Sequence, residues 1–119
     1  MRKQASTNTI NKEQLESNCG IAYTNSILNG RWKLSILAFL LDEKKLRYSD
    51  LKNKLLGISE RMLIAQLKEL QADDLIKRIS HPEVPPRVEY ELSEKGKSLE
   101  NILIQMAEWG TKNKSKNNR

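Results

Sequence analysis

Residues 81–92, HPEVPPRVEYEL, constrain the fold more than any other stretch of this sequence. All three prolines of the chain lie there within five residues. Each proline fixes φ at about −65° and biases its predecessor towards extended backbone. After the prolines, Val88, Tyr90 and Leu92 alternate strictly with charged residues. The segment therefore predicts a stiff loop leading into a β-strand that has one core face and one solvent face.

Helical patterns surround this strand. Leu63, Leu67 and Leu70 recur at i, i+4 and i+7 behind Ser59, a residue type that caps helix amino termini. Asn29 and Gly30 are the residue types that end a helix in left-handed geometry. We therefore expect helices at about residues 19–28, 32–41, 46–57 and 58–74, then a strand before the proline loop and a strand after it. Ser93 is expected to cap a final helix with a broad apolar stripe: Leu99, Ile102, Leu103, Met106 and Trp109.

This order predicts a mostly helical α+β fold. A short helix, a tight glycine turn, a second helix and then a hairpin form the layout of a winged helix–turn–helix with a two-stranded wing. Residues 1–18 are polar and predict a mobile arm, and residues 111–119 predict a disordered basic tail. The domain itself is expected at residues 19–110.

The distribution of charge is more informative than its total of +6. The tail at residues 111–119 carries four basic residues and no acid, which accounts for +4. Residues 31–68 hold nine basic and four acidic residues, whereas residues 69–110 hold five basic and nine acidic residues. This asymmetry points to a polyanion-binding face on the first of these two segments.

Several classes of protein fit this sequence poorly. The longest apolar run, residues 34–41, is far shorter than the ~20 residues of a membrane span, and the amino terminus lacks the apolar core of a secretory signal. A single cysteine excludes an internal disulfide framework and favours a cytoplasmic protein. No phosphate-binding glycine loop or metal-ligand spacing accompanies the lone His81, so we expect no enzyme, cofactor or metal site.

The face opposite the leucines of the 58–74 helix carries the candidate base contacts. Arg61 suits guanine O6 and N7 or a phosphate, Ile64 and Ala65 suit thymine methyl groups, and Lys68 suits a phosphate. The alternative is an ordinary solvated helix face. The complete candidate set on this helix is Ser59, Glu60, Arg61, Ile64, Ala65 and Lys68.

The proline loop has two readings. In one it is only a stiff surface turn, since turns favour proline. In the other it is a wing that carries Arg87 into a DNA minor groove, with basic residues near phosphates at its base and flank: Arg47, Lys77 and Arg78. The loop directly follows the candidate reading helix, which favours the second reading.

Three segments resemble the HxlR family of bacterial and archaeal transcription regulators, a MarR-like winged-helix group. They are NGRWKLSILAFLL, LRYSDLKNKLLGISERMLIAQLKEL and HPEVPPRVEYELSEKGKSL with the later AEWG, and they cover about residues 19–110. The resemblance implies a homodimer on an inverted-repeat operator, with residues 58–70 as recognition helix and the hairpin as wing. It also implies that the first and last helices form the dimer interface, burying Ile102, Met106 and Trp109 there.

The sequence departs from the family pattern at three positions. Ile64 stands where the family more often has a small hydroxyl residue, so a base contact there should be apolar. Glu60 places an acid beside the phosphates, where it must accept from cytosine N4 or turn away. Gly20 follows the cysteine where many relatives have proline, which loosens the start of the first helix.

Cys19 lies at the expected amino end of a helix, where free N–H groups and the helix dipole favour the thiolate. Some family members sense oxidants or electrophiles through a cysteine at this position. Without a second cysteine, this chain could form only an adduct, a mixed disulfide or a bond to its dimer mate. The alternative is a small apolar side chain that simply packs.

A protein-interaction module is the rival function, because winged helices can bind partners through the same surfaces. Its acidic segment, residues 69–110, would suit a basic partner. The sequence does not identify the operator, the target genes, an effector or the sign of regulation.

Overall fold

The computed structural model describes residues 19–117, which fall into two compact units divided between Gly30 and Arg31. The expected arm at residues 1–18 lies outside the described residues. In the first unit, α2 spans Gly20–Leu28 with Cys19 at its N-cap. Asn29 is extended, and the left-handed backbone after the helix falls on Gly30 alone, at φ 105°. The helix therefore ends at Leu28 as expected, and Gly30 rather than Asn29 takes the left-handed conformation.

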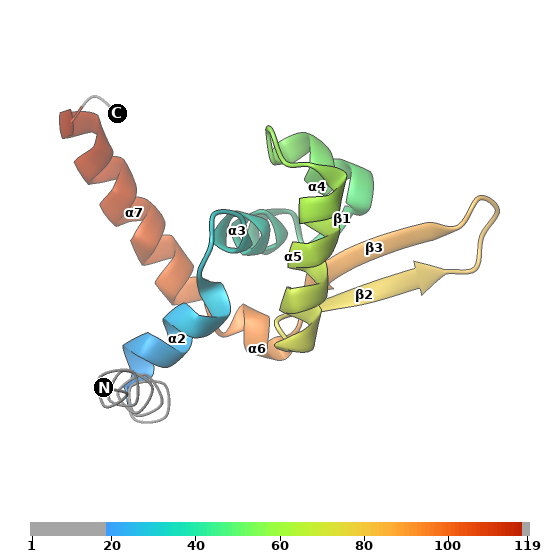
Figure 1. Cartoon of the computed structure of the whole chain (residues 1–119), viewed down its shortest axis with the longest axis horizontal. Helices are drawn as coiled ribbons and strands as arrows, with labels where there is room; N and C mark the ends of the chain where they lie inside the picture. The colour runs from blue at the N-terminus through green and yellow to red at the C-terminus, as the bar shows by residue number, and fades with distance from the viewer. Residues whose placement is uncertain (1–18, 118–119) are drawn as a thin grey trace, which may run out of the picture. The chain divides into compact units, whose positions relative to one another are not determined.

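The second unit begins at Arg31 and contains every other element (Figure 1). The elements are α3 (Lys33–Glu43), β1 (Lys45–Arg47), α4 (Tyr48–Lys54), α5 (Glu60–Ala72), β2 (Ile76–His81), β3 (Arg87–Leu92), α6 (Glu94–Lys97) and α7 (Glu100–Asn117). The mostly helical fold, the helix–turn–helix of α4 and α5, and the hairpin of β2 and β3 all match the sequence expectation. The element order confirms a winged helix.

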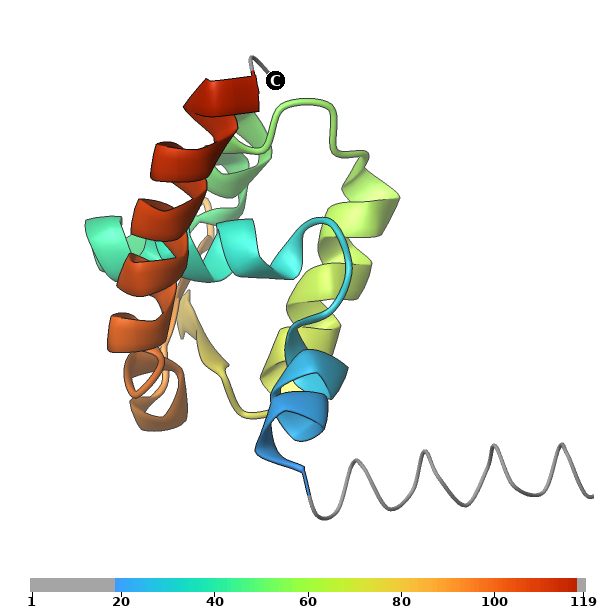
Figure 2. The ribbon, with the colours of Figure 1, turned by 90° about the vertical axis from the view of Figure 1, so that its left-hand side faces the viewer.

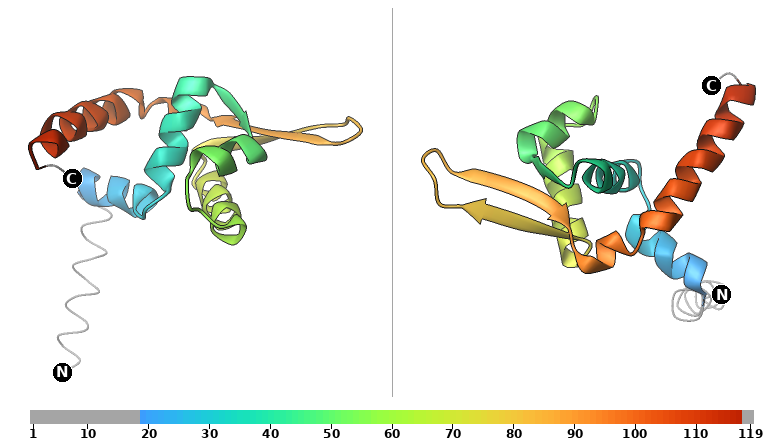
Figure 3. Two further views of the ribbon diagram at one scale, coloured as in Figure 1. Left: turned by 90° about the horizontal axis from the view of Figure 1, so that it is seen from above. Right: turned by 180° about the vertical axis from the view of Figure 1, so that it is seen from behind.

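The sheet has three antiparallel strands in the order β1-β3-β2, where two were expected. In β1, Leu46 faces Tyr90 of β3 and is 6% exposed, while its two neighbours are exposed. The expected helix at residues 46–57 therefore starts later, at Tyr48. Residues 45–47 form a strand because they pair with the edge of β3 that β2 leaves open. Figure 3 shows the hairpin of β2 and β3 extending past α4 and α5 at one end of this unit.

The core lies where α3 and α5 meet the sheet. Ile36, Leu37 and Leu40 of α3 are at most 1% exposed. The predicted stripe of α5 is equally buried, which confirms its orientation: Leu63, Leu67 and Leu70. Because these leucines face the core, the opposite face of α5 must point outward.

The end of α5 is tied to the start of α6. Asp74 adopts a left-handed backbone at φ 59°, and Leu75 N–H donates to Leu70 C=O at 2.9 Å, which closes the helix. The buried Ser93 hydroxyl donates to Asp74 C=O and accepts from Gly96 N–H at 3.0 Å. The acidic pair at residues 73–74 is thus a helix-ending turn, since aspartate tolerates this conformation better than most side chains.

The final helix is two helices rather than one. Ser93 caps the four-residue α6, and α7 starts only at Glu100 after a break at residues 98–99. Leu99, just before α7, and Leu103 within it are buried, and the helix crosses α3 (Figure 2). The expected disordered tail from residue 111 was wrong for residues 111–117, which continue α7 because no glycine or proline follows Gly110 there. No helix in the described part of the chain is long and apolar enough to cross a membrane.

Candidate nucleic-acid interface

The outward face of α5 carries the side chains that the sequence singled out. Ser59 is the N-cap, and its Oγ accepts from Met62 N–H at 3.0 Å, as predicted. This bond uses an acceptor lone pair of the hydroxyl, so its O–H can still donate to a phosphate. Beyond the cap, four of the six candidates are exposed along the helix, and Ala65 is half-buried between them: Glu60, Arg61, Ile64 and Lys68.

A hollow separates α5 from the wing, which is defined here as β2, β3 and the loop at residues 82–86. Its volume is about 310 Å³, and it brings Ile64 and Lys68 of α5 next to Arg78 of β2. Tyr90 closes the floor and is 7% exposed. Two cations, Lys68 and Arg78, thus border one groove beside the apolar Ile64. Lysine and arginine are the residue types that contact the phosphates of a duplex.

Sequence reasoning missed Gln71, which borders the same hollow. The signal was present, because residues 64, 68 and 71 follow the same i, i+4, i+7 rule that located the inner stripe. Its amide can donate and accept, as adenine recognition requires.

The base of the wing carries the other predicted cations. Lys77 and Arg78 are exposed on β2, and Arg78 Nη1 donates to Ser80 Oγ at 3.4 Å. Arg47 ends β1 opposite Glu89 of β3. Its backbone N–H donates to the Asp50 carboxylate at 3.0 Å, which closes the first turn of α4 and leaves the guanidinium exposed.

Arg87 does not project from the tip of the wing. It is the first residue of β3 and pairs with His81, so the exposed tip consists of residues 82–86. Its guanidinium forms a two-point pair with Glu83, from Nη2 to Oε2 at 2.7 Å and from Nε to Oε1 at 3.3 Å. Nη1 lies 3.0 Å from Oε1 of Glu89, which also bonds His81 Nε2 at 2.8 Å. The expected free cation is instead the centre of a local ion-pair network.

The two carboxyl groups of this network have lowered pKa values. The hydrogen bond from Arg87 lowers the pKa of Glu83, and the positive charges of Arg87, His81 and Arg47 add to the effect. The hydrogen bond to His81 lowers the pKa of Glu89, followed by the charge of Arg87. Both groups are therefore ionised at neutral pH, and the pKa of Arg87 is raised by the same contacts.

Close to α5, the Tyr48 hydroxyl is buried and has no hydrogen-bond partner among the described residues. Burial raises its pKa, with a smaller contribution from the negative charge of Glu60. Glu60 itself is exposed in the first turn of α5.

On α7 the predicted apolar stripe divides into two faces. Leu99 and Leu103 pack within the unit, whereas the three residues predicted for a dimer interface stay exposed, Trp109 most of all at 70%: Ile102, Met106 and Trp109. Cys19 is partly exposed at the start of α2, with no side-chain cap bond.

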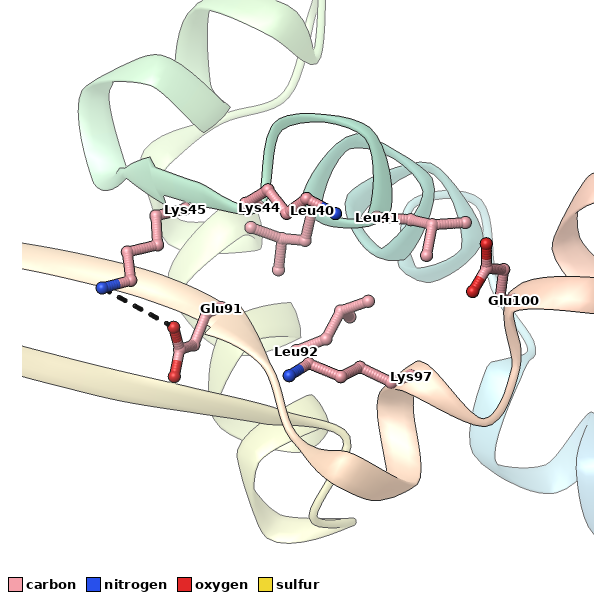
Figure 4. A pocket seen from close by; sticks show the side chains of 8 residues that line it. All are labelled: Leu40, Leu41, Lys44, Lys45, Glu91, Leu92, Lys97 and Glu100. Atoms are coloured by element: carbon pink, nitrogen blue, oxygen red, sulfur yellow. Dashed lines mark ion pairs between the residues drawn. The ribbon is translucent and has the colours of Figure 1, made fainter.

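A second hollow of about 350 Å³ lies on the other side of β3 (Figure 4). Its floor is apolar, and its rim carries charges of both signs: Lys44, Lys45, Lys97, Glu91 and Glu100. Lys45 and Glu91 approach each other to 3.9 Å. None of its lining residues belongs to α5 or β2, so it is separate from the groove described above. Among the described residues, no three His, Cys, Asp or Glu side chains are grouped so that they could hold a metal ion.

Comparison with known proteins agrees with this architecture. Residues 27–118 match the family model described as HxlR-like helix-turn-helix. The MalR protein of Fusobacterium mortiferum is 50% identical over 95 residues, covering 80% of this chain and 90% of that protein. The HTH-type transcriptional regulator YtcD of Bacillus subtilis is 46% identical over 98 residues, covering 82% of this chain and 77% of YtcD.

Solved structures give the same result. The redox regulator HypR in its oxidised form superimposes with a TM-score of 0.75 at 39% identity, over 80% of this chain and 97% of that one. The similarity therefore extends across the helix–turn–helix, the wing and most of the rest of the chain.

Proposed function

The chain belongs to the HxlR-like helix-turn-helix family of transcriptional regulators, and from that membership we propose that it acts as a homodimer on an inverted-repeat operator. In this proposal α5 enters the major groove and the wing lies along the neighbouring backbone. The observation that carries the proposal is the groove between them, where Lys68 and Arg78 border one hollow beside the exposed Ile64.

The candidate residues of α5 and β2 divide into two roles. Arg61 and Ile64 are proposed to contact base edges, because a guanidinium suits guanine and an apolar branch suits the thymine methyl group. Lys68, Lys77 and Arg78 are proposed to contact phosphates, which set register but carry no sequence information. Glu60 is the exception, and we assign it to cytosine N4 or to solvent.

Pairing of two copies is proposed to occur through α7. Ile102, Met106 and Trp109 form an exposed apolar stripe on α7, a helix in which Leu103 is the one buried residue among residues 100–114. Exposed apolar stripes of this kind mark interaction surfaces. Two-fold pairing would place two α5 helices about 34 Å apart, one turn of B-DNA.

A gel shift tests the function directly. The full chain is incubated with mixed genomic fragments and an excess of non-specific competitor DNA. A band that survives competition, and that weakens steeply with salt, supports the proposal. Binding that disappears completely with competitor would instead favour a protein-interaction module.

We propose in addition that oxidants act on this protein through Cys19. The thiol is partly exposed at the N-cap of α2, and a similar structure is that of a redox regulator. With one cysteine per chain, two thiols could join only across the dimer, giving two protons and two electrons to an oxidant such as diamide.

Two measurements decide this second proposal. Diamide should change the affinity for a selected operator and should produce a cross-linked dimer or a mixed disulfide with added glutathione, and Cys19→Ser should abolish both effects. Unchanged affinity after alkylation of Cys19, with no cross-link under oxidant, would leave the cysteine a packing residue.

A further inference from the structure

At the loop end of the wing, the Arg87 guanidinium is held in a two-point pair with the Glu83 carboxylate of the same loop. Within residues 81–87 the charged side chains are Glu83 and Arg87, beside the titratable His81. Val84 at the tip is 100% exposed and three prolines flank it, so an approaching duplex meets apolar side chains and the Glu83 carboxylate. The wing tip therefore offers DNA no unpaired cation.

The edge of Arg87 that Glu83 occupies is the edge that a phosphate would use. A phosphate presents two oxygens to the guanidinium fork in nearly the same geometry as a carboxylate. Glu83 takes Nε and Nη2, while Nη1 is held separately by Glu89. Exchange of one two-oxygen partner for another on the Nε and Nη2 edge would leave the Glu89 contact in place.

The two carboxylates differ in how easily they can be displaced. The Glu89 side chain is 16% exposed, lies within a strand and also bonds His81. The Glu83 side chain is 50% exposed and lies on the loop. Glu89 thus anchors the guanidinium, and Glu83 is the replaceable partner.

The loop also keeps Glu83 in position. The Glu83 N–H donates to the His81 carbonyl at 2.8 Å, an i to i+2 bond that makes a γ-turn around Pro82. Proline has a φ suited to the centre of such a turn, so little conformational entropy is lost in holding the carboxylate beside Arg87. A pre-positioned carboxylate competes with phosphate at high local concentration.

We propose that Glu83 is a built-in competitor of DNA phosphate for Arg87, and that the wing contacts the backbone only when phosphate displaces it. This inference rests on the proposed function, because it presumes that the wing lies along DNA. Its consequence is weak wing binding to arbitrary sequence. Since phosphate contacts carry no sequence information, removing the competitor should raise affinity for random and selected duplexes by similar factors.

The test compares three variants of the full chain. Glu83→Gln keeps the shape of the side chain and removes its charge. Glu91→Gln makes the same charge change on the same hairpin, where the carboxylate lies near Lys45 rather than Arg87. The double variant Glu83→Gln with Arg87→Gln, measured against Arg87→Gln alone as its reference, asks whether the effect passes through the guanidinium. Thermal melting of each variant verifies that it is folded.

Affinity is measured by fluorescence anisotropy with a labelled random-sequence duplex and with a duplex selected from random DNA. We expect Glu83→Gln to bind both about three- to tenfold more tightly, from the loss of a competing ion pair and of a repelled carboxylate. The slope of log K against log salt should become steeper by about 0.9 for each wing, or about 1.8 for the dimer. Glu91→Gln should change affinity less than twofold, and the gain should vanish in the Arg87→Gln background.

Three results would overturn the inference while leaving the proposed function intact. These are a selected duplex bound equally by wild type and Glu83→Gln, an equal gain from Glu91→Gln, or a gain that persists without Arg87. A wild-type chain that binds neither duplex would overturn both the proposed function and this inference.

Discussion

The ammonium group of Lys33 lies 2.6 Å from the carboxylate of Glu69 and joins α3 to α5. Lys33 is 5% exposed, whereas more than half of the Glu69 side chain is in contact with solvent. A buried ammonium group requires an opposite charge, because desolvation otherwise costs more than burial of its methylenes gains. This pair helps to hold the candidate reading helix against the core.

Loss of the Glu69 charge should therefore destabilise the fold. We expect Glu69→Gln to lower the free energy of unfolding by about 1–2 kcal/mol, because it leaves the buried Lys33 ammonium without an opposite charge. The loss is limited because the Glu69 side chain is half exposed, so solvent already screens the pair. Lys33→Met should stay within about 1 kcal/mol of wild type. It removes the buried charge itself, and the Glu69 carboxylate that loses its partner is still hydrated by solvent. Urea unfolding at one fixed protein concentration measures both. Glu43→Gln, which breaks the exposed pair with Lys54, is the control, and an equal loss there would contradict the argument.

Two glycines should respond oppositely to alanine. A Cβ on Gly96 would overlap the Leu75 carbonyl, whereas a Cβ on Gly110 meets nothing within 4 Å. Gly96→Ala should thus cost about 2–3 kcal/mol through overpacking, and Gly110→Ala should stabilise α7 by about 0.5–1 kcal/mol. Thermal unfolding compares them. A tolerated Gly96→Ala would show that the contact between α6 and the end of α5 can relax.

Base and phosphate contacts on α5 should separate by their effect on sequence choice. Arg61→Ala is expected to lower affinity for a selected duplex by about 1–3 kcal/mol and to relax preference at one base pair. Lys68→Ala should weaken binding to all sequences equally and reduce the salt slope by about 0.9 for each subunit, or about 1.8 for the dimer. Anisotropy titrations at several salt concentrations measure this, with Lys97→Ala on α6 as the charge-matched control. The assignment fails if Lys68→Ala changes base preference.

Pairing through α7 can be tested with two substitutions on the same helix. Met106 lies on the exposed face with Ile102 and Trp109, whereas Ile104 is exposed on the opposite side, given about 100° per residue. Met106→Glu should convert the chain to monomers and remove operator binding, because a charge would be buried in an apolar contact. Ile104→Glu should leave both unchanged. Sedimentation velocity distinguishes the two, and equal behaviour of both variants would exclude this face as the interface.

The sequence was sufficient for the elements with strong periodicity. The leucines of α5, its Ser59 cap and the alternation in β3 all act locally, so their pattern predicts both element and buried face. The strand β1 was missed because three residues with one apolar side chain carry no period of their own; a free edge on β3 makes them a strand. The break between α6 and α7 was missed because residues 98 and 99 are serine and leucine, and neither marks a helix end in the local pattern.

The candidate site was only partly predictable. The helix face of α5 follows from its period, and the groove between α5 and the wing follows from the topology of the fold. The state of Arg87 could not be read from the sequence, because its partners depend on the loop conformation and on the register that places it opposite His81. A cation in a sequence shows that a charge is present, and only the fold shows whether that charge is already neutralised.

The central claim is that two copies of this chain present two α5 helices to one duplex. Selection of bound fragments from random DNA by the full chain tests it most directly. The account predicts enrichment of a two-fold symmetric sequence whose half-sites are centred about one helical turn apart, or a whole multiple of it. Enrichment of a single asymmetric site, or of no sequence at all, would contradict it.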